Sequence, residues 1–449
     1  MRYNLLKRQK IWRELTWTLF ERRQADMHWI ANRLPDECCV VPVFQDQCLF
    51  FSCLFAAVTK GTPCLFLSDH SLESIKRLRS DFCCIHLVTD RDSHGTFKSD
   101  EVLRIASTTV DSVCNSVEKL VMDPAGDQIV LKVFSSGSTG IPRFYSKTWT
   151  ALIEEARMID RSLKLGDHAR HLISTVPPNH MYGFSYGLFG PLHWGMSIDA
   201  ERPVFPLDLR RVLLAAPDSA WVVTTPTHLR AYMESAVELP KLAGFICSTA
   251  PLPLELARSV EERFGCALIE TYGSTETGAI AWRHPTQGQK WTCYDAISIS
   301  MDEQMRVYAP HLPLEGQSLD DRVRLLDKSH FEIIGRSSDL VKIAGKRASL
   351  FELNAKLCDI PDVKDGTFFI PPKKADQPQD NIRLGAFVVS DEQDPQIILD
   401  ELRNRIDQVF LPRPLVMVSE LPRDANSKLP RAALEKLWYA HFDKGRALI

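Results

Sequence analysis

The residues from Ser135 to Arg143, which read SSGSTGIPR, combine hydroxyl side chains with glycines in a pattern suited to holding an anion. An apolar run, Ile129 to Phe134, precedes them and predicts a buried strand. The apolar residues between Leu152 and Leu163 then recur at the spacing of one helix face. Glycines let the backbone approach an anion, and hydroxyl and N–H groups donate hydrogen bonds to it. The sequence therefore predicts a phosphate-binding loop between a strand and a helix. It is not the P-loop that ends in Gly-Lys-Ser/Thr, because that ending is missing.

Three further segments follow this loop in a fixed order, and each carries residues suited to nucleotide chemistry. They are Tyr272 to Glu276 (YGSTE), Gly335 to Arg347, and Leu421 to Arg431. A flat ring suits a base, and a carboxylate suits Mg²⁺. In this order the four segments resemble those of the adenylate-forming superfamily, which comprises acyl-CoA synthetases, aryl-acid ligases, adenylation domains and firefly-type luciferases. The resemblance runs from about residue 128 to the C-terminus.

The first segment resembles the family motif (S/T)SG(S/T)TGxPK, with Arg143 in place of the lysine. The resemblance implies that this loop holds the β- and γ-phosphates of ATP. The phosphate-binding residues that it implies are Ser135, Ser136, Gly137, Ser138, Thr139, Gly140 and Arg143. Arginine is a planar fork rather than a point donor, so we expect pyrophosphate to be handled differently than in members with lysine.

The second segment resembles the family's YGxTE motif. The resemblance implies that Tyr272 lies against adenine, with Gly273 beside it. It also implies that Thr275 binds the α-phosphate and that Glu276 is the ligand of Mg²⁺. A hard carboxylate oxygen is the kind of ligand that Mg²⁺ prefers.

Two more regions resemble parts of the nucleotide pocket. The segment with Thr249 and Ala250 is similar to one that lines adenine in the family. Counting back from Arg336, which would touch the ribose, places Asp321 where the family has the aspartate that holds both ribose hydroxyls. A carboxylate is a natural double acceptor for a vicinal diol. Asp320 is the alternative, because the usual threonine-glycine pair does not precede this site.

The last two segments resemble the hinge and the mobile-domain motifs of the family. Ser338 stands at the hinge position, and Lys342 and Gly345 belong to the loop that follows it. Gly345 would let a pantetheine arm pass close to the backbone. Lys428 matches the lysine of the motif LPxTxxGKxxR, although Ser427 replaces the glycine before it. The resemblance implies that Lys428 bridges the substrate carboxylate and the α-phosphate, where it would neutralise charge in the transition state.

The residues that would bind the carboxylic acid are harder to identify from the sequence. His180 sits where the family places its acyl-pocket segment, so it could contact the carboxylate or line the pocket; a histidine in an apolar segment is also typical of a hydrogen-bonded core. Tyr182, Phe184 and Tyr186 form either a wall for a flat acid or ordinary core packing. No residue resembles the acidic group that amino-acid adenylation domains use for an α-ammonium. We therefore expect an aryl or medium fatty acid.

The composition sets the remaining bounds. A chain of 449 residues exceeds one ordinary domain, and 45% hydrophobic with 25% charged residues is typical of a soluble globular protein. The net charge of −3 gives no reason to expect a nucleic-acid partner. The 12 cysteines show no metal spacing, so we expect buried, reduced thiols. We expect neither a cleavable leader nor a membrane-spanning run. Residues 4–23 are expected to form an ordinary surface helix, with a membrane-lying amphipathic helix as the alternative, and we expect a cytoplasmic protein.

The order of predicted elements gives the fold class. Strand-like runs alternate with helical patterns from Val40 to Tyr272, which favours α/β layers of mostly parallel strands. A helix that Gly265 ends leads into a strand from Ala267, and residues 285–330 read as short strands and turns. The C-terminal part has a strand candidate at 384–389 and helix candidates at 396–410 and 431–442. We therefore expect a large α/β domain over 1–336 and a small, mobile α+β domain over 337–449.

Together these features predict an ATP-dependent, AMP-forming acid–thiol ligase. It would join a carboxylic acid to AMP and then to a phosphopantetheine thiol. Because the chain is short before the phosphate loop, it resembles compact ligases that load an acyl carrier protein, such as those of aryl polyene pathways. Free coenzyme A is the alternative acceptor. Rivals are a non-catalytic nucleotide-binding protein, suggested by Arg143, Ser338 and Ser427, and a luciferase-type oxygenase, for which the sequence offers nothing.

Overall fold

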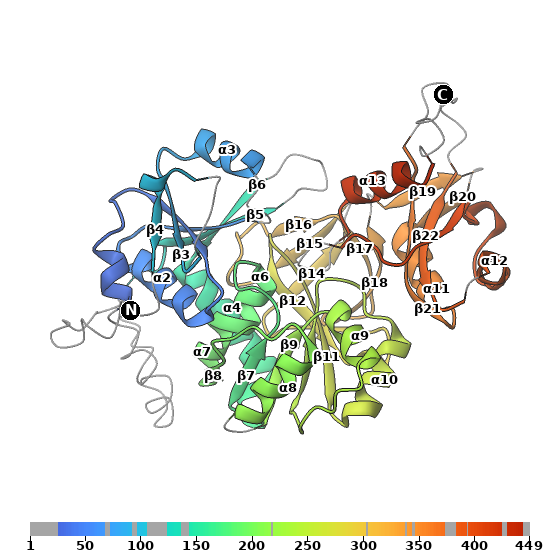
Figure 1. The fold of residues 1–449 in the computed structure, drawn as a ribbon, viewed down its shortest axis with the longest axis horizontal. Coiled ribbons are helices and arrows are strands. Elements are labelled where there is room, and N and C mark those ends of the chain that lie inside the picture. The colour runs from blue at the N-terminus through green and yellow to red at the C-terminus, as the bar shows by residue number, and fades with distance from the viewer. Residues whose placement is uncertain are drawn as a thin grey trace.

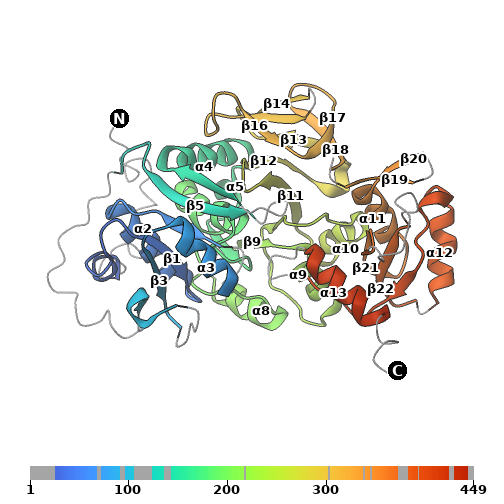
Figure 2. The same cartoon turned by 90° about the horizontal axis from the view of Figure 1, so that it is seen from above.

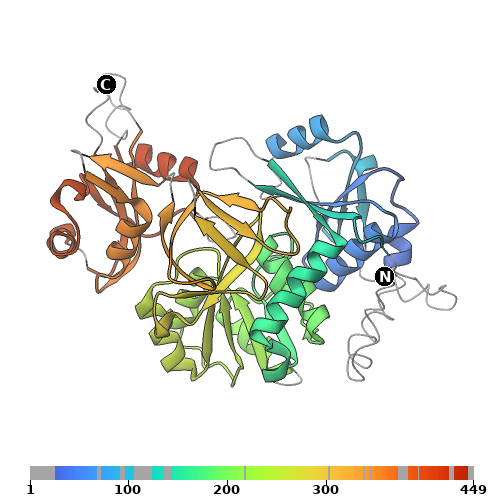
Figure 3. The same ribbon diagram turned by 180° about the vertical axis from the view of Figure 1, so that it is seen from behind.

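A computed structural model describes residues 26–67, 72–91, 97–105, 124–135, 143–216, 219–301, 304–336, 339–343, 346–372, 383–392, 394–423 and 429–442. The helix expected over residues 4–23 lies outside these ranges. The chain forms an elongated molecule in which the N-terminal part, drawn in blue, and the C-terminal part, drawn in orange and red, lie at opposite ends of a green and yellow middle (Figure 1 and Figure 3).

The first sheet has six strands in the order β4-β3-β1-β2-β5-β6. All neighbours in it are parallel except β5 and β6, which pair antiparallel. Parallel strands need covered faces, and the residues of the inner strands β1, β2 and β3 are accordingly mostly apolar and buried. The strands are β1 (Cys39–Val43), β2 (Cys64–Phe66), β3 (Ile85–Thr89), β4 (Val102–Arg104), β5 (Ile129–Ser135) and β6 (Arg143–Thr148).

The second sheet has nine strands in the order β17-β18-β13-β12-β11-β10-β9-β7-β8. Strands β7 to β11 are parallel to one another, whereas the pairings from β11 to β17 are antiparallel. The segment between β13 and β17 forms a separate three-stranded sheet, β14-β15-β16. The strands are β7 (His171–Ser174), β8 (Ser197–Ile198), β9 (Ala220–Thr224), β10 (Gly244–Cys247), β11 (Ala267–Ser274), β12 (Gly278–Arg283), β13 (Trp291–Cys293), β14 (Ser298–Met301), β15 (Met305–Tyr308), β16 (Gln317–Leu319), β17 (Asp321–Leu325) and β18 (His330–Arg336).

The helices of the large part begin and end where their sequences require it. Helix α2 starts after Asp46, whose carboxylate accepts from two backbone N–H groups, and its apolar sequence is buried on nearly all sides. Helix α10 ends at Gly265, whose φ of +59° needs a residue without Cβ, as predicted. The helices are α2 (Gln47–Thr59), α3 (Leu72–Asp81), α4 (Trp149–Leu163), α5 (Leu165–His168), α6 (Met181–Phe184), α7 (Gly190–Trp194), α8 (Pro206–Ala215), α9 (Pro226–Glu234) and α10 (Leu254–Phe264).

One apolar cluster joins the first sheet to the helices beside the second. It contains Phe66 of β2, Leu152 of α4 and Phe184 of α6. The rings of Phe66 and Phe184 pack edge to face, with their centroids 5.4 Å apart. Because α4 also contacts β6 and β12, this helix fixes the distance between the two sheets.

The C-terminal part is a small α+β unit with its own core, which includes Leu353, Ala386 and Leu402. It lies beyond α9 and α10 at one end of the molecule (Figure 2). Asp365 of β21 accepts from Arg423 at 2.7 and 2.8 Å and lies 4.0 Å from Arg230 of α9, so it contacts both parts. The elements are β19 (Leu340–Ile343), β20 (Lys346–Ser349), α11 (Leu350–Cys358), β21 (Val363–Phe369), β22 (Gly385–Ser390), α12 (Pro395–Arg403), β23 (Leu415–Met417) and α13 (Arg431–Phe442).

The expected fold class is confirmed: layered, mostly parallel sheets with helices form a large N-terminal part, and a small α+β part follows. The boundary expected between residues 336 and 337 stays a prediction. Two details were wrong. The phosphate loop leads into strand β6 rather than directly into a helix, because β6 pairs antiparallel with β5 before α4 begins. The helix expected over 396–410 ends at Arg403, and a separate 3-10 turn follows at Gln408–Phe410.

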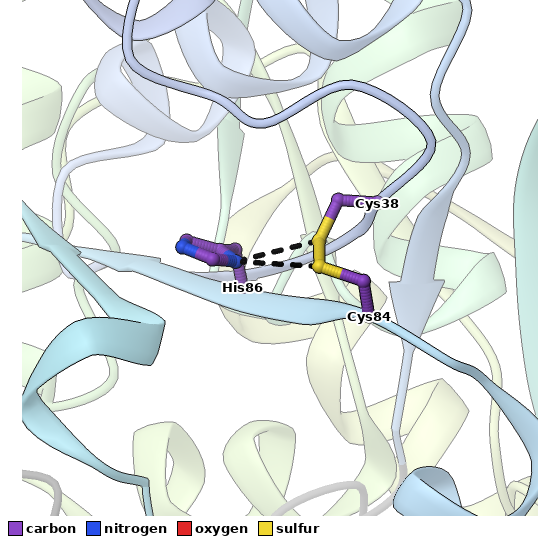
Figure 4. Close-up of a disulfide and its surroundings, with 3 residues drawn as sticks. All are labelled: Cys38, Cys84 and His86. Carbon is purple, nitrogen blue, oxygen red and sulfur yellow. Dashed lines mark hydrogen bonds between the residues drawn. A yellow bond between two sulfur atoms is a disulfide. The ribbon is translucent and has the colours of Figure 1, made fainter.

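The expectation that all cysteines are reduced thiols was also wrong, because Cys38 and Cys84 form a disulfide (Figure 4). Strands β1 and β3 are parallel neighbours with Cys39 opposite Ile85. The residues before these positions therefore lie side by side, with Cα atoms 4.7 Å apart. His86 lies next to the bridge, with Nδ1 3.4 Å from the Sγ of Cys38.

Among the described residues, no helix is both long enough and apolar enough to cross a bilayer.

Candidate active site

The carboxyl ends of four parallel strands place hydroxyl residues along one edge of the second sheet. Thr175 follows β7, Thr225 follows β9, Thr249 lies just beyond β10, and Ser274 ends β11. In open α/β sheets, ligands bind beyond the carboxyl ends of the strands. The predicted nucleotide segments at 248–252 and 272–276 thus reach the same edge, as the resemblance requires.

Tyr272 and Gly273 are held on β11 by packing. The ring of Tyr272 contacts Trp291 and Phe331, with centroids 5.6 and 6.0 Å apart. A bulge interrupts the pairing between Tyr272 and Gly273. A Cβ on Gly273 would lie 2.3 Å from the carbonyl oxygen of Gly278, so only glycine fits here.

Thr275 and Glu276 form the tip of the turn between β11 and β12, and both are partly exposed. Beneath the tip, the Thr277 N–H donates to the hydroxyl of Ser274 at 3.1 Å, and the two hydroxyls lie 2.9 Å apart. The turn is therefore braced by its own side chains. This leaves the Glu276 carboxylate and the Thr275 hydroxyl as oxygen groups of the type that suits Mg²⁺ and phosphate.

Thr249 is strained, and its hydroxyl is unused. Its φ is +83°, a value that β-branched residues rarely adopt. Its Oγ1 is buried without a hydrogen-bond partner among the described residues. The flanking residues hold this geometry: Ser248 donates to the Thr271 carbonyl at 2.7 Å, and the Leu252 N–H donates to Glu270 at 3.3 Å. Strain together with an unsatisfied donor is typical of a ligand-binding position.

Glu270 anchors this loop from inside the sheet. Burial raises the pKa of its carboxyl group, and Arg283, which donates to it at 2.6 Å, opposes that shift. Arg283 itself packs over the ring of Trp291 at 4.6 Å. The loop with Thr249 and the Trp291 ring that contacts Tyr272 are thus fixed by the same ion pair.

The two predicted ribose residues lie opposite each other. Asp321 begins β17 and pairs in register with Arg336, which ends β18. Ala250, also predicted for the nucleotide, lies partly buried next to Thr249. The choice between Asp321 and Asp320 stays a prediction, since both are partly buried at the start of the same strand.

The phosphate loop is described only at its base. Ser135 and Arg143 pair across β5 and β6, and Arg143 is exposed. Lys342 is exposed on β19. The other predicted residues lie outside the described chain, namely Ser136, Gly137, Ser138, Thr139, Gly140, Ser338, Gly345, Ser427 and Lys428.

The three rings near His180 are core residues. Tyr182 donates to the Ile246 carbonyl at 2.6 Å, and the hydroxyls of Tyr186 and Tyr294 lie 2.5 Å apart. Phe184 has no exposed surface. Of the two interpretations left open by the sequence, core packing is therefore the one observed. His180 itself precedes α6 and is partly buried.

Sequence reasoning missed two ionisable residues near this edge. His228, at the start of α9, has its Nδ1 2.8 Å from the hydroxyl of Thr175. Burial and the nearby Arg202 lower its pKa to about 4. Lys147 of β6 is buried and donates to the backbone carbonyl of Glu276 at 2.8 Å. A histidine and a lysine in unremarkable positions give no sequence signal, because their neighbours come from distant segments.

These features place the residues predicted for the nucleotide at the carboxyl ends of the parallel strands of the nine-stranded sheet. The chain belongs to the AMP-binding enzyme family, whose profile matches residues 56–311, more than half of its length. The expected place in the adenylate-forming superfamily is thereby confirmed, and so is the expectation of an AMP-forming acid–thiol ligase at the level of the family.

Curated relatives with 27–28% identity are named as ligases that form coenzyme A thioesters. A 4-coumarate–CoA ligase of Halorhodospira halophila is 28% identical over 333 residues, which are 69% of this chain and 78% of that protein. A 4-coumarate–CoA ligase of Cereibacter sphaeroides is 27% identical over 304 residues, covering 66% of this chain and 69% of that protein.

Solved structures share the fold at lower identity. The anthranilate CoA ligase AuaEII, in complex with anthranoyl-AMP, superposes with a TM-score of 0.76 and 17% identity, covering 93% of this chain and 91% of that one. ATP-bound MatB from Rhodopseudomonas palustris gives 0.79 and 16%, covering 94% and 93%. At these identities the likeness shows the fold alone.

His228 makes stability depend on pH. Its pKa in the folded protein is about 4, below the ordinary value near 6.5, so the unfolded chain binds the extra proton. The contribution is therefore complete above pH 6.5 and is lost as the pH falls toward 4. Urea unfolding at pH 7 and pH 5 should show a loss that is about 2 kcal/mol smaller in His228→Gln than in the unsubstituted protein. His441→Gln, at the exposed end of α13, should leave the loss unchanged. An equal loss in His228→Gln would contradict the assignment.

Proposed function

We propose that this protein activates a carboxylic acid with ATP and transfers the acyl group to a phosphopantetheine thiol. The observation that carries the proposal is the convergence of the Tyr272–Glu276 turn and the strained Thr249 at one sheet edge, in a chain of the AMP-binding enzyme family. The Thr249 hydroxyl, which has no partner among the described residues, and the partly exposed side chains of Thr275 and Glu276 fit a nucleotide and its metal.

In the first half-reaction, a carboxylate oxygen of the acid attacks the α-phosphorus of ATP. The new bond gives an acyl-adenylate, and the bond to the β-phosphate breaks so that pyrophosphate leaves. Thr275 and the loop from Ser135 to Arg143 would hold the phosphates, and Lys428 would neutralise charge between the carboxylate and the α-phosphate. Glu276 would hold Mg²⁺, which neutralises phosphate charge when bound.

The nucleoside would be held by groups on three elements. Tyr272 would lie against adenine, with Thr249 and Ala250 on the opposite loop. Asp321, placed opposite Arg336 by the register of β17 and β18, would accept from the ribose hydroxyls. Asp320 is the alternative ribose ligand and lies one residue before that register.

In the second half-reaction, the thiol sulfur attacks the acyl carbonyl carbon. The bond to AMP breaks, AMP leaves, and the thiol proton passes to solvent. We propose that the small domain turns about Ser338 between the two steps, which withdraws Lys428 and brings Gly345 to the site. His180 would line the acid pocket.

We propose an aryl or conjugated acid as the substrate. The core packing of Tyr182 and Tyr186 removes one argument for this choice, since neither ring is free to form a pocket wall. The remaining support is the 4-coumarate specificity in the names of two relatives and the anthranilate named for a structural neighbour. Other relatives are named for malonate and oxalate, so the panel of acids to be tested must include both kinds.

Lys428 separates the two half-reactions. Lys428→Ala should lower acid-dependent ATP–pyrophosphate exchange by roughly a hundredfold or more, the scale of a lost transition-state charge contact. Thioester formation from pre-made acyl-adenylate should survive. Lys436→Ala, exposed on α13, serves as the control and should match the unsubstituted enzyme. Equal loss in both half-reactions would show that Lys428 has another role.

Thr249 is predicted to hold ligand with its unused hydroxyl. Thr249→Val keeps the shape but removes a buried donor that has no partner in the part of the chain that the structure describes, so the free energy of unfolding should stay the same or rise by about 1 kcal/mol. Binding of Mg·ATP, measured by calorimetry, should weaken by about five- to tenfold. Thr227→Val, exposed on α9, controls for the substitution. Unchanged affinity would remove Thr249 from the nucleotide site.

The acceptor decides between two kinds of ligase. We propose an acyl carrier protein of a pigment or polyketide type, by resemblance to compact carrier-loading ligases such as those of aryl polyene pathways. Contacts outside the thiol arm should raise kcat/KM for the cognate holo carrier at least about tenfold over coenzyme A, or about 1.4 kcal/mol. The comparison uses one acid, saturating ATP and mass detection of thioester. If coenzyme A is the equal or better acceptor, the protein is an acyl- or aryl-CoA ligase.

A further inference from the structure

Three ionisable side chains lie beneath the turn that carries Thr275 and Glu276. Lys147 comes from β6 and Glu155 from α4, and they are 5% and 3% exposed. His311 comes from the segment after β15 and is partly buried. Each of the three makes a hydrogen bond to the backbone between Glu276 and Ala279.

The hydrogen bonds fix which way the turn faces. Lys147 Nζ donates to the carbonyl of Glu276 at 2.8 Å, and His311 Nε2 donates to the carbonyl of Thr277 at 2.7 Å. Glu155 accepts from the N–H of Ala279 at 2.9 Å. Two consecutive carbonyls of the turn therefore point toward these side chains, which hold the backbone in place from beneath.

The turn also packs closely on Glu155. Gly278 has a φ of +69°, and a Cβ placed on it would lie 2.6 Å from the Glu155 carboxylate. Glu155 in addition accepts from the hydroxyl of Ser185 at 3.0 Å. The buried carboxylate is thus satisfied, and the position of the backbone at 278 and 279 is set by contact with it.

A buried lysine at this position is not explained by stability. Desolvation lowers the pKa of Lys147, and the negative charges of Glu155 and Glu276 oppose this shift only in part. A methionine would fill the same space without desolvating an amine. The lysine is therefore better explained by what its N–H group holds, which is the carbonyl of Glu276.

Lys147 also connects two sheets. Strand β6 belongs to the six-stranded sheet and begins at Arg143, where the predicted phosphate loop ends. The turn belongs to the nine-stranded sheet. The bond from Lys147 to Glu276 thus runs from the strand that leaves the phosphate loop to the residue proposed to hold Mg²⁺.

We propose that Lys147 is a positioning residue for Mg·ATP: it holds the Glu276 turn against strand β6 through the backbone carbonyl of Glu276. This inference rests on the proposed function of Glu276. Loss of the bond lets the turn move relative to β6, which weakens binding of the metal–nucleotide complex. Because Glu276 has no part in binding the acid in the proposed function, affinity for the acid should not change.

The test compares Lys147→Met, which lacks the donor, with Lys147→Gln, which keeps an N–H donor without the charge. In acid-dependent ATP–pyrophosphate exchange with 4-coumarate as the probe, Lys147→Met should raise the KM for Mg·ATP and the Mg²⁺ concentration for half-maximal rate by about tenfold or more. The KM for the acid should stay within twofold. Lys147→Gln should recover part of the loss. Lys132→Met, on the adjacent strand β5 with its Nζ over the Phe82 ring, is the matched control and should resemble the unsubstituted enzyme.

Three outcomes decide the proposal. If Lys147→Met folds, with an unchanged circular dichroism spectrum, and its KM values and Mg²⁺ requirement stay within twofold, the proposal is overturned. A rise in the KM for the acid equal to that for Mg·ATP also overturns it, because a general loss of structure would have that effect. If Lys147→Met does not fold, Lys147→Gln decides: a rise of at least threefold in the KM for Mg·ATP alone supports the proposal, and no rise overturns it.

Failure of the proposed function would be distinguishable. The unsubstituted enzyme would then show no exchange with 4-coumarate or with any other acid of a panel of benzoates, cinnamates, fatty acids and dicarboxylates. In that case calorimetric titration with Mg·ATP still compares Lys147→Met with Lys132→Met. Weaker binding in Lys147→Met alone supports the positioning role, and equal binding rejects it.

Discussion

The buried carboxylate of Glu155 is the point on which the two halves of the large domain depend. It sits on α4 and accepts from Ala279 at the start of β12 and from Ser185 beside α6. A carboxylate inside a protein must be satisfied or it destabilises the fold. Helix, sheet and loop therefore have one mutual arrangement in which all three can be buried together. The turn between β11 and β12 is positioned by that arrangement, because the N–H of Ala279 just after it is one of the required donors.

Sequence patterns predicted well those elements that are determined by residues close together in the sequence. Helix α10 and its glycine stop follow from apolar spacing and a left-handed residue, and α13 begins and ends where predicted. Strand β6 was missed because its sequence, RFYSKT, shows no apolar alternation and is a strand only through its pairing with β5. The Cys38–Cys84 bridge was missed because it depends on which strands are neighbours in a sheet.

The candidate site shows the same difference between residues with a local sequence pattern and residues placed by distant segments. Tyr272, Gly273 and Glu276 were predicted from a motif, because a ring, a glycine and a carboxylate within a few residues suit a nucleotide and its metal, and their role stays a prediction. The packing of Tyr182 and Tyr186 in the core could not be predicted, since a ring in a pocket and a ring in a core have the same sequence. Lys147 gave no signal either: a lysine in a strand usually faces solvent, and its burial comes from the second sheet.

The double pairing of Asp365 bears on how the small domain can leave the large one. Its carboxylate is held in a bidentate fashion by Arg423 from its own domain and more loosely, at 4.0 Å, by Arg230 from the other. If the two parts separate, Asp365 stays bonded to Arg423, and the two side chains move together as a pair with no net charge. The carboxylate of Asp365 would then stay paired, and only Arg230 would lose a partner. The Asp365–Arg230 ion pair is therefore a weak electrostatic contact between the two parts. The rate at which this contact breaks should rise with ionic strength, because salt screens the attraction.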